Sequence, residues 1–215
     1  MTSQNLKGFT LIEMAIVLVI VGLILGGLLL PLSVQVDQKK YNETHQALGE
    51  IREAIMGFSL SHSALDGKPY LPCPDTDANG MENRTGAICT SPEGDLPWAD
   101  LGMPRLDGWD RTYRYRVTPA YSSNAVGFTL TSLGVIDVLD AVAGNVIASN
   151  LPLVVFSRGK NGVSGSVDEA ENSDNDTVFV SHPPSEVAGS EFDDALVWVP
   201  SVLLFNRMVT ASRLP

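Results

Sequence analysis

A long apolar run near the amino terminus limits what this chain can fold into more than any other feature of its sequence. The run begins at Phe9, contains one acidic residue, Glu13, and then carries no charge through Val36. As a helix, residues 9–34 would be about 39 Å long, enough to cross a hydrocarbon core of about 30 Å with tilt. A carboxylate in such a segment costs about 2.5–3.5 kcal/mol on insertion scales, so Glu13 needs a partner. The sequence predicts a membrane-spanning helix in which this acid is functional.

The residues around the run indicate that it stays on the mature protein. A secretory signal peptide places a small-residue cleavage site after its apolar stretch. Here no Ala-x-Ala site follows the run before Asp37, whereas Lys7 and Gly8 stand directly before it. We therefore expect the apolar run to remain on the mature chain.

The segment Lys7-Gly-Phe-Thr-Leu-Ile-Glu13 resembles the type III signal of type IV prepilins and pseudopilins. The resemblance implies that prepilin peptidase cuts between Gly8 and Phe9, that Phe9 is then N-methylated, and that Glu13 serves assembly. After that cut, the amine of Phe9 and the carboxylate of Glu13 would lie about one helical turn apart, and in a packed filament Glu13 could pair with the amine of a neighbouring subunit. The alternative is a single-pass anchor with a tolerated acid near one end. The resemblance also implies as partners other pilin or pseudopilin subunits, in a homo- or hetero-filament, and an inner-membrane assembly platform. The expected location is the inner membrane, with a single pass and the head in the periplasm, or outside the cell if the subunit enters a pilus.

Three segments are expected: a leader peptide (1–8), a transmembrane and filament-core helix (9–36), and a periplasmic or extracellular head domain (37–215). Pro31 removes a helix hydrogen bond, which predicts a kink there. Beyond Asp37, residues spaced by three and four predict that the helix continues to about Ser63 with one amphipathic face. This face comprises Tyr41, Thr44, Leu48, Ile51, Ile55, Phe58 and His62.

Alternating patterns and short apolar runs predict strands in the rest of the head, followed by a terminal helix. The expected strands are 112–117, 126–133, 151–156, 178–180 and 196–199, and the helix begins at Ser201 with Leu204, Phe205, Met208 and Val209 on one face. We therefore expect an α+β fold in which the long helix, half transmembrane and half amphipathic, packs on an antiparallel sheet. Together with the resemblance, this implies a pilin-like roll.

The middle of the chain is similar to the major pseudopilin of type II secretion. The similar segments are Asp107–Arg116, Phe128–Gly134 and the turn Ser157–Gly162. The chain departs from that family in having Asp-Gly where the family has Asp-Pro, in its cysteine-containing loop, and in the segment from Val135 to Leu153. The chain could therefore be a minor pilin or a minor pseudopilin as well as a major subunit.

Cys73 and Cys89 are the two cysteines of the chain, and both lie on the exported side of the proposed anchor. In an oxidising compartment they are expected to form a disulfide, which closes a loop of about 15 residues and stabilises the fold by about 3 kcal/mol. Two free thiols, or half of a metal site, are the alternatives.

Three acidic clusters, at 168–169, 174–176 and 193–194, flank a short expected strand and could converge. Calcium prefers six to eight oxygen ligands. By resemblance to the calcium loop of the major pseudopilin, the expected ligands are Asp174, Asp176, and Asp193 or Asp194. A solvated acidic loop is the alternative, and we expect no other cofactor.

Charge and motifs weigh against other classes of function. The formal net charge is −11, with 25 acidic residues against 14 basic ones, which argues against nucleic acid as the main ligand. Arg114 and Arg116 share a strand face and are expected to pair with the acidic loops. The sequence contains no Gly-x-Ser-x-Gly elbow, no complete phosphate loop and no cysteine with a nearby base, so we expect no enzyme.

The sequence thus predicts a structural subunit of a type IV pilus or of a type II secretion pseudopilus. The alternative is a non-polymerising binding module, tethered to the membrane and facing the periplasm.

Overall fold

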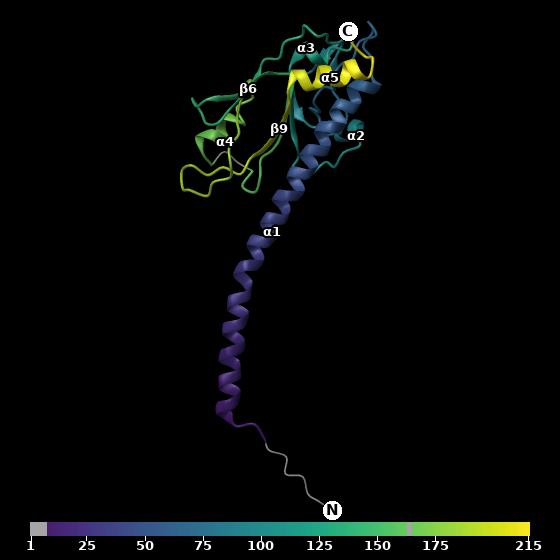
Figure 1. Cartoon of the computed structure of the whole chain (residues 1–215). Helices are drawn as coiled ribbons and strands as arrows, with labels where there is room; N and C mark the ends of the chain where they lie inside the picture. The colour runs from purple at the N-terminus through teal and green to yellow at the C-terminus, as the bar shows by residue number, and fades with distance from the viewer. Residues whose placement is uncertain (1–7, 163–164) are drawn as a thin grey trace, which may run out of the picture. The chain divides into compact units, whose positions relative to one another are not determined.

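One long helix opens the chain, and short strands and helices make up the remainder (Figure 1). The computed structural model describes residues 8–162 and 165–215, and the side chains of these residues other than 25 and 27–33. The helices are α1 (Leu11–Ser61), α2 (Trp98–Leu101), α3 (Pro119–Ser122), α4 (Val167–Glu171) and α5 (Ser201–Thr210). The strands are β1 (Arg84–Thr85), β2 (Ile88–Cys89), β3 (Glu93–Asp95), β4 (Arg114–Val117), β5 (Ile136–Leu139), β6 (Val146–Leu151), β7 (Leu153–Ser157), β8 (Val178–Val180) and β9 (Ala195–Val199).

The contacts divide the chain into two units, Met1–Lys40 and Tyr41–Pro215. The division falls a few residues after the expected boundary between 36 and 37. We call the second unit the head and describe the two units separately.

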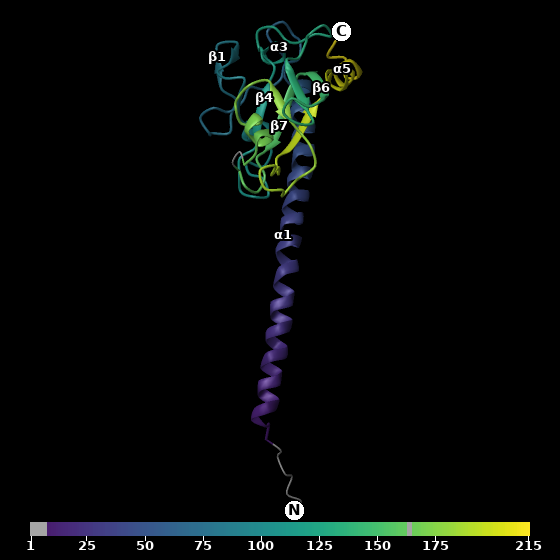
Figure 2. The same ribbon diagram turned by 90° about the vertical axis from the view of Figure 1, so that its left-hand side faces the viewer.

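Two sheets form the centre of the head. The larger sheet has the order β3-β4-β7-β9 and is antiparallel throughout. The smaller sheet has the order β6-β5-β8, in which β5 pairs with β6 antiparallel and with β8 parallel. The expected α+β class is confirmed, whereas the expectation of a purely antiparallel sheet is wrong for β8. Figure 2 shows β4 and β7 in the middle of the head.

The larger sheet carries a core on each face because its central strand alternates between them. Leu153 and Val155 of β7 pack with Ile51 and Ile55 of α1 in the main core. Val154 and Phe156 of the same strand pack in a second core with β5, β6 and β8. None of the described residues in these clusters precedes Ala47. The head thus contains complete cores of its own and is expected to fold without residues 1–40.

The amphipathic face predicted for α1 is the face that the head buries. Thr44, Leu48, Ile51, Ile55 and Phe58 are buried, Tyr41 is half-buried, and His62 is exposed, although its ring stacks on Phe58. The helix ends at Ser61, close to the expected end. Helix α5 lies beside this part of α1 (Figures 1 and 2), where Arg207 pairs with Glu53 at 2.6 Å. Of its predicted stripe, Leu204 and Met208 are buried, whereas Val209 is exposed.

The strand expected at 126–133 is absent, and the segment forms turns instead. The hydroxyl of Ser132 accepts a hydrogen bond from the Thr129 N–H at 3.0 Å, and the Ser132 N–H returns to the Thr129 carbonyl at 3.0 Å. Such local bonds give the backbone an alternative to a sheet ladder. By contrast, the expectations at 112–117, 151–156, 178–180 and 196–199 correspond to β4, β7, β8 and β9, whereas β5 and β6 were not predicted.

The second core yields a test of the two-sided sheet. Phe156 is fully buried in it. Replacing Phe156 with alanine removes a buried ring and leaves a cavity, so we expect the free energy of unfolding of the head to fall by about 3–5 kcal/mol. Urea unfolding followed by circular dichroism measures this change. Val187→Ala, at an exposed position, is the control and should change stability little; a Phe156→Ala loss no larger than that control would contradict a second core.

Candidate functional site

The predicted processing site lies directly before the first helix. Gly8, Phe9 and Thr10 precede α1, and all three are exposed. The Phe9 side chain is 81% exposed. A peptidase can therefore reach the bond between Gly8 and Phe9 without unwinding the helix.

Glu13 has a local partner that the sequence analysis did not assign. Its Oε2 accepts hydrogen bonds of 2.8 Å from both the backbone N–H and the hydroxyl of Thr10. The N–H of Glu13 donates in return to the Thr10 hydroxyl at 3.3 Å. This reciprocal pair is a capping box, which satisfies N–H groups that the start of a helix leaves free. The Thr-x-x-Glu spacing at 10–13 is the sequence signal that could have predicted it.

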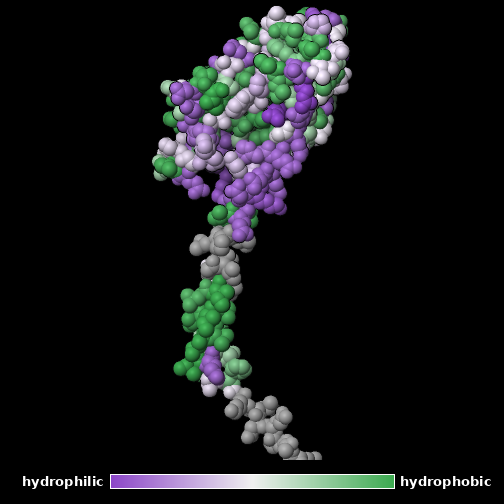
Figure 3. All heavy atoms as spheres, viewed as in Figure 1, coloured by the Kyte–Doolittle hydropathy of each residue, from purple (hydrophilic) through white to green (hydrophobic). Residues whose placement is uncertain are grey.

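Apolar side chains surround the beginning of α1 (Figure 3). Leu11, Leu18 and Leu23, for example, are 90%, 69% and 72% exposed. Among the residues whose side chains the structure describes, no helix has an apolar stretch long enough to cross a membrane. The side chains at 25 and 27–33 lie outside that description. Helix α1 itself continues through Pro31. That residues 9–36 span a membrane, and that the helix is kinked at Pro31, stay predictions.

The predicted disulfide between Cys73 and Cys89 is formed, with the two Cα atoms 5.2 Å apart. The loop that it closes contains Asp75, which is buried and accepts backbone N–H bonds from Asp77, Ala78 and Gly80. Both Asp75 oxygens therefore organise the turn 75–80. This segment is therefore a turn.

Arg114 and Arg116 pair with carboxylates of β3, whereas pairing with the carboxylates of the acidic loops had been expected. Glu93 is buried and accepts from Arg114 at 3.1 Å and from Arg116 at 3.0 Å. Arg114 also pairs with Asp95 at 2.9 Å, and Arg116 reaches the carbonyl of Asn175 in an acidic loop. Both arginines are thus engaged in ion pairs within the head.

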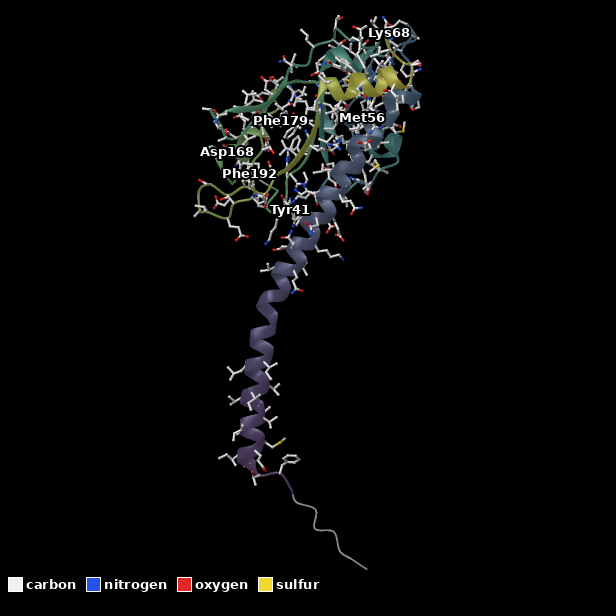
Figure 4. The ribbon with its side chains drawn as sticks, in the orientation of Figure 1. Tyr41, Met56, Lys68, Asp168, Phe179 and Phe192 are labelled. Carbon is white, nitrogen blue, oxygen red and sulfur yellow. A yellow bond between two sulfur atoms is a disulfide. The ribbon has the colours of Figure 1, made fainter. Side chains whose placement is uncertain are left out.

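The expected calcium ligands do not form one cluster. The structure places Asp174 and Asp176 with Glu171, and Asp193 and Asp194 with Glu169. Asp174 accepts from the N–H of Asp176, and Asp176 accepts from the N–H of Val178, so both cap a turn at an exposed position. Among the described residues, Asp174 and Asp176 therefore lie in a different carboxylate group from Asp193 and Asp194, the alternatives for the third expected ligand. Asp168, which is labelled in Figure 4, belongs to neither group and pairs with His182 at 3.2 Å.

The cluster of Glu169, Asp193 and Asp194 is the better cation site. Each residue offers a carboxylate oxygen, and these oxygens lie within 4.8 Å of one another. Glu169 is buried and accepts from the Asp193 N–H at 3.0 Å and from Asn161. The Oδ1 of Asp193 is buried and accepts no hydrogen bond from the part of the chain that the structure describes. Three oxygen donors with one unpartnered buried oxygen fit a hard cation such as calcium.

A glycine makes this cluster possible. Gly159 has a φ of +57°, and a Cβ there would lie 2.2 Å from Oδ1 of Asp193. A side chain at 159 would therefore displace the carboxylate. Sequence analysis placed Glu169 in one of the three acidic clusters but left it out of the expected ligand set, and it gave Gly159 no role, because the contacts of both with Asp193 depend on the fold.

Burial perturbs the two aspartates. It raises the pKa of Asp194 to about 7, against the hydrogen bond from Asn172, and the nearby charges of Glu169 and Asp193 raise it further. Burial also raises the pKa of Asp193. Buried carboxylates that repel one another are stabilised when one of them binds a proton or when the group binds a cation.

The comparison with protein families bears on the amino-terminal segment. Residues 4–29 match the family described as the prokaryotic N-terminal methylation motif. This motif is the signature of type IV pilins and pseudopilins, which the sequence resemblance had indicated. It indicates a pilin-like substrate of prepilin peptidase and implies a membrane-anchored precursor whose general partners are that peptidase and other pilin subunits. No match was found among curated proteins or among solved structures.

The pKa of Asp194 sets a pH dependence of stability. Because its folded-state pKa lies above its ordinary value, the folded head holds a proton that the unfolded chain releases, so the contribution of Asp194 to stability is fully present below its ordinary pKa and is lost as pH rises through about 7. In EDTA we expect the head to unfold at lower urea concentration at pH 8 than at pH 5. Asp194→Asn should remove most of this difference, whereas Asp110→Asn, at an exposed position, should leave it unchanged. An unaltered pH dependence in Asp194→Asn would contradict the assignment.

Proposed function

We propose that this protein is a structural subunit of a type IV pilus or of a type II secretion pseudopilus. The observation that carries the proposal is the methylation motif at residues 4–29, with Glu13 as the single charge of the apolar run. Prepilin peptidase would remove residues 1–8, and Phe9 would be N-methylated. The helix from Phe9 to Val36 would first cross the inner membrane once, with the head in the periplasm, and later pack in the filament core through the assembly platform.

The arrangement of the first turn supports an assembly role for Glu13. The capping box uses Oε2, so the carboxylate keeps one oxygen for a second partner. In a filament core, the methylated amine of a neighbouring Phe9 would neutralise that charge in a low dielectric. A helix that carries apolar side chains on every face is stable only in lipid or among other helices. The proposed subunit would meet both environments, first in the membrane and then in the filament core.

The head supports the proposal by its architecture. The amphipathic half of α1 lies on one face of an antiparallel four-stranded sheet, as in the pilin-like roll that the resemblance implies. We expect no enzymatic activity. The second candidate, a non-polymerising binding module on a tether, would require that the bond after Gly8 stays intact and that Glu13 has no part in assembly.

Glu13 offers a test that separates its charge from its role in starting the helix. Glutamine can replace glutamate in a capping box, so Glu13→Gln keeps the local hydrogen bond and loses the charge. Removing one partner of a buried ion pair costs about 3–5 kcal/mol, and we expect incorporation into filaments to fall at least about tenfold. The measurement is the amount of subunit in sheared or membrane-derived filaments from the native host.

Thr10→Ala is the matched control because it weakens the capping box and keeps the charge. It should be cleaved and incorporated nearly as the natural chain is. Mass spectrometry of the amino-terminal peptide checks that every variant is processed to methylated Phe9. Normal incorporation of Glu13→Gln would refute the assembly role of the charge, and an uncleaved terminus in the natural chain would favour the tethered module.

We further propose that Glu169, Asp193 and Asp194 bind calcium in the head. Binding would relieve the repulsion among these carboxylates, so calcium should raise the melting temperature of the head more at pH 8 than at pH 5, where protons compete. Asp194→Asn should lose most of the effect, whereas the double variant Asp174→Asn/Asp176→Asn should retain it. An equal loss in both variants would mean that calcium acts at the exposed cluster or on general surface charge.

A further inference from the structure

Two turns of the head connect its cation site with α1. We call this site the carboxylate cluster; it consists of Glu169, Asp193 and Asp194. The first turn, residues 158–162, follows β7 and contacts the cluster. The second turn, residues 107–111, comes shortly before β4 and contacts Thr44 of α1. The two turns are also bonded to each other, so the cluster and the helix belong to one network.

Asn161 holds the first turn against the carboxylate cluster. Its N–H donates to Oδ2 of Asp193 at 2.8 Å, and its side-chain amide donates to Glu169 at 3.1 Å. Gly159 and Gly162 have φ angles of +57° and +65°. Because glycine leaves the backbone free to adopt many conformations, two glycines give this turn little order of its own. Its conformation therefore depends on the groups that it contacts.

Two side chains join the first turn to the second. Ser157, at the end of β7, accepts from the N–H of Gly159 at 3.1 Å and donates to Oδ2 of Asp107. Arg111 donates to the carbonyls of residues 160 and 161, each at 3.0 Å. Ser157 and Asp107 are both buried, so water does not compete freely for this link. The order of one turn therefore supports the order of the other.

The second turn is fixed to α1. Asp107 organises it by accepting from the N–H of Trp109 at 2.8 Å and from the N–H of Arg111 at 2.9 Å. The N–H of Gly108 then donates to the hydroxyl of Thr44 at 3.0 Å. Thr44 is the first buried residue of the head unit. The network thus extends from the carboxylates to the place where the head begins to cover the helix.

We propose that calcium binding at the carboxylate cluster is coupled, through the turns 158–162 and 107–111, to the contact between Gly108 and Thr44. The inference rests on the calcium site proposed above and gives that site a regulatory role at α1. A cation would supply the buried Oδ1 of Asp193 with the partner that it lacks among the described residues, and it would thereby fix the first turn. Since the turn loses its conformational freedom once, calcium and the contact at Thr44 each lower the cost of the other.

The coupling makes the attachment of α1 to the head depend on calcium. Because such a coupling is reciprocal, loss of the contact at Thr44 must weaken calcium binding by the factor by which calcium strengthens the contact. This holds although Thr44 is not a member of the carboxylate cluster. Couplings between two sites usually change affinity by about 5–150-fold.

Titration calorimetry of the full chain in detergent with calcium chloride measures one direction of the coupling. Valine has nearly the shape of threonine but accepts no hydrogen bond, so Thr44→Val should raise the Kd for calcium about fivefold or more. Arg111→Lys keeps the charge but loses the planar fork that holds two carbonyls, and it should act in the same direction. Ser59→Ala is the matched control, since it removes another buried hydroxyl of α1 outside the network and should leave the Kd unchanged.

Hydrogen exchange of the natural chain measures the other direction and needs no variant. Calcium should slow the exchange of the Gly108 N–H about fivefold or more. The turn 75–80, whose N–H groups bond to Asp75, lies outside the network and should exchange at an unchanged rate. Equal slowing in both turns would mean general stabilisation of the head and would overturn the coupling.

The results separate the coupling from the site itself. An unchanged Kd in both Thr44→Val and Arg111→Lys, with each variant folded by circular dichroism, would overturn the coupling and leave the calcium site in place. A natural chain that binds no calcium would refute the site, and the coupling with it. A rise of the Kd in Ser59→Ala equal to that in Thr44→Val would reflect a general loss of stability and count against the coupling.

Discussion

The head depends on one strand that is buried on both faces. All five residues of β7 are buried, and they alternate between the core under α1 and the core under the smaller sheet. In its neighbours β4 and β9, Tyr115, Val117 and Val199 lie in the core on the helix side, whereas Leu196 and Trp198 of β9 pack against the other core. A single strand therefore couples the two layers, and a change in its register would move apolar side chains out of both cores at once.

The elements that were predicted from the sequence are those whose residue spacing within one segment determines which side chains are buried. The α1 face, the strands β4, β7, β8 and β9, the start of α5 and the disulfide follow from spacing and composition. Strands β5 and β6 of the smaller sheet were not predicted, because they form an irregular ladder with register shifts and their sequences show no clean alternation. The acidic loops were recognised as such, but which carboxylates meet depends on how β8 and β9 bring their flanking loops together. Gly159 and Glu169 show this well, since each matters only through a contact with Asp193 that is distant in sequence.

Glu13 illustrates how one side chain can serve two successive environments. In the chain described here it closes the first turn of α1 with Thr10. This local bond lowers the cost of holding a carboxylate in an apolar segment before any partner is available, because part of its hydrogen-bonding capacity is already met. The acidic residue that looks like a defect in the apolar run is thus compatible with both a solitary helix and a packed one.

The bond between Cys73 and Cys89 has a consequence for following the protein in cells. Thiols of the reducing cytoplasm stay open to alkylation, whereas an oxidising compartment closes them. Since the chain has these two cysteines and no others, the mass added by a thiol reagent reports whether a given molecule has met an oxidising compartment. The redox state of this cysteine pair can therefore be followed on untagged protein.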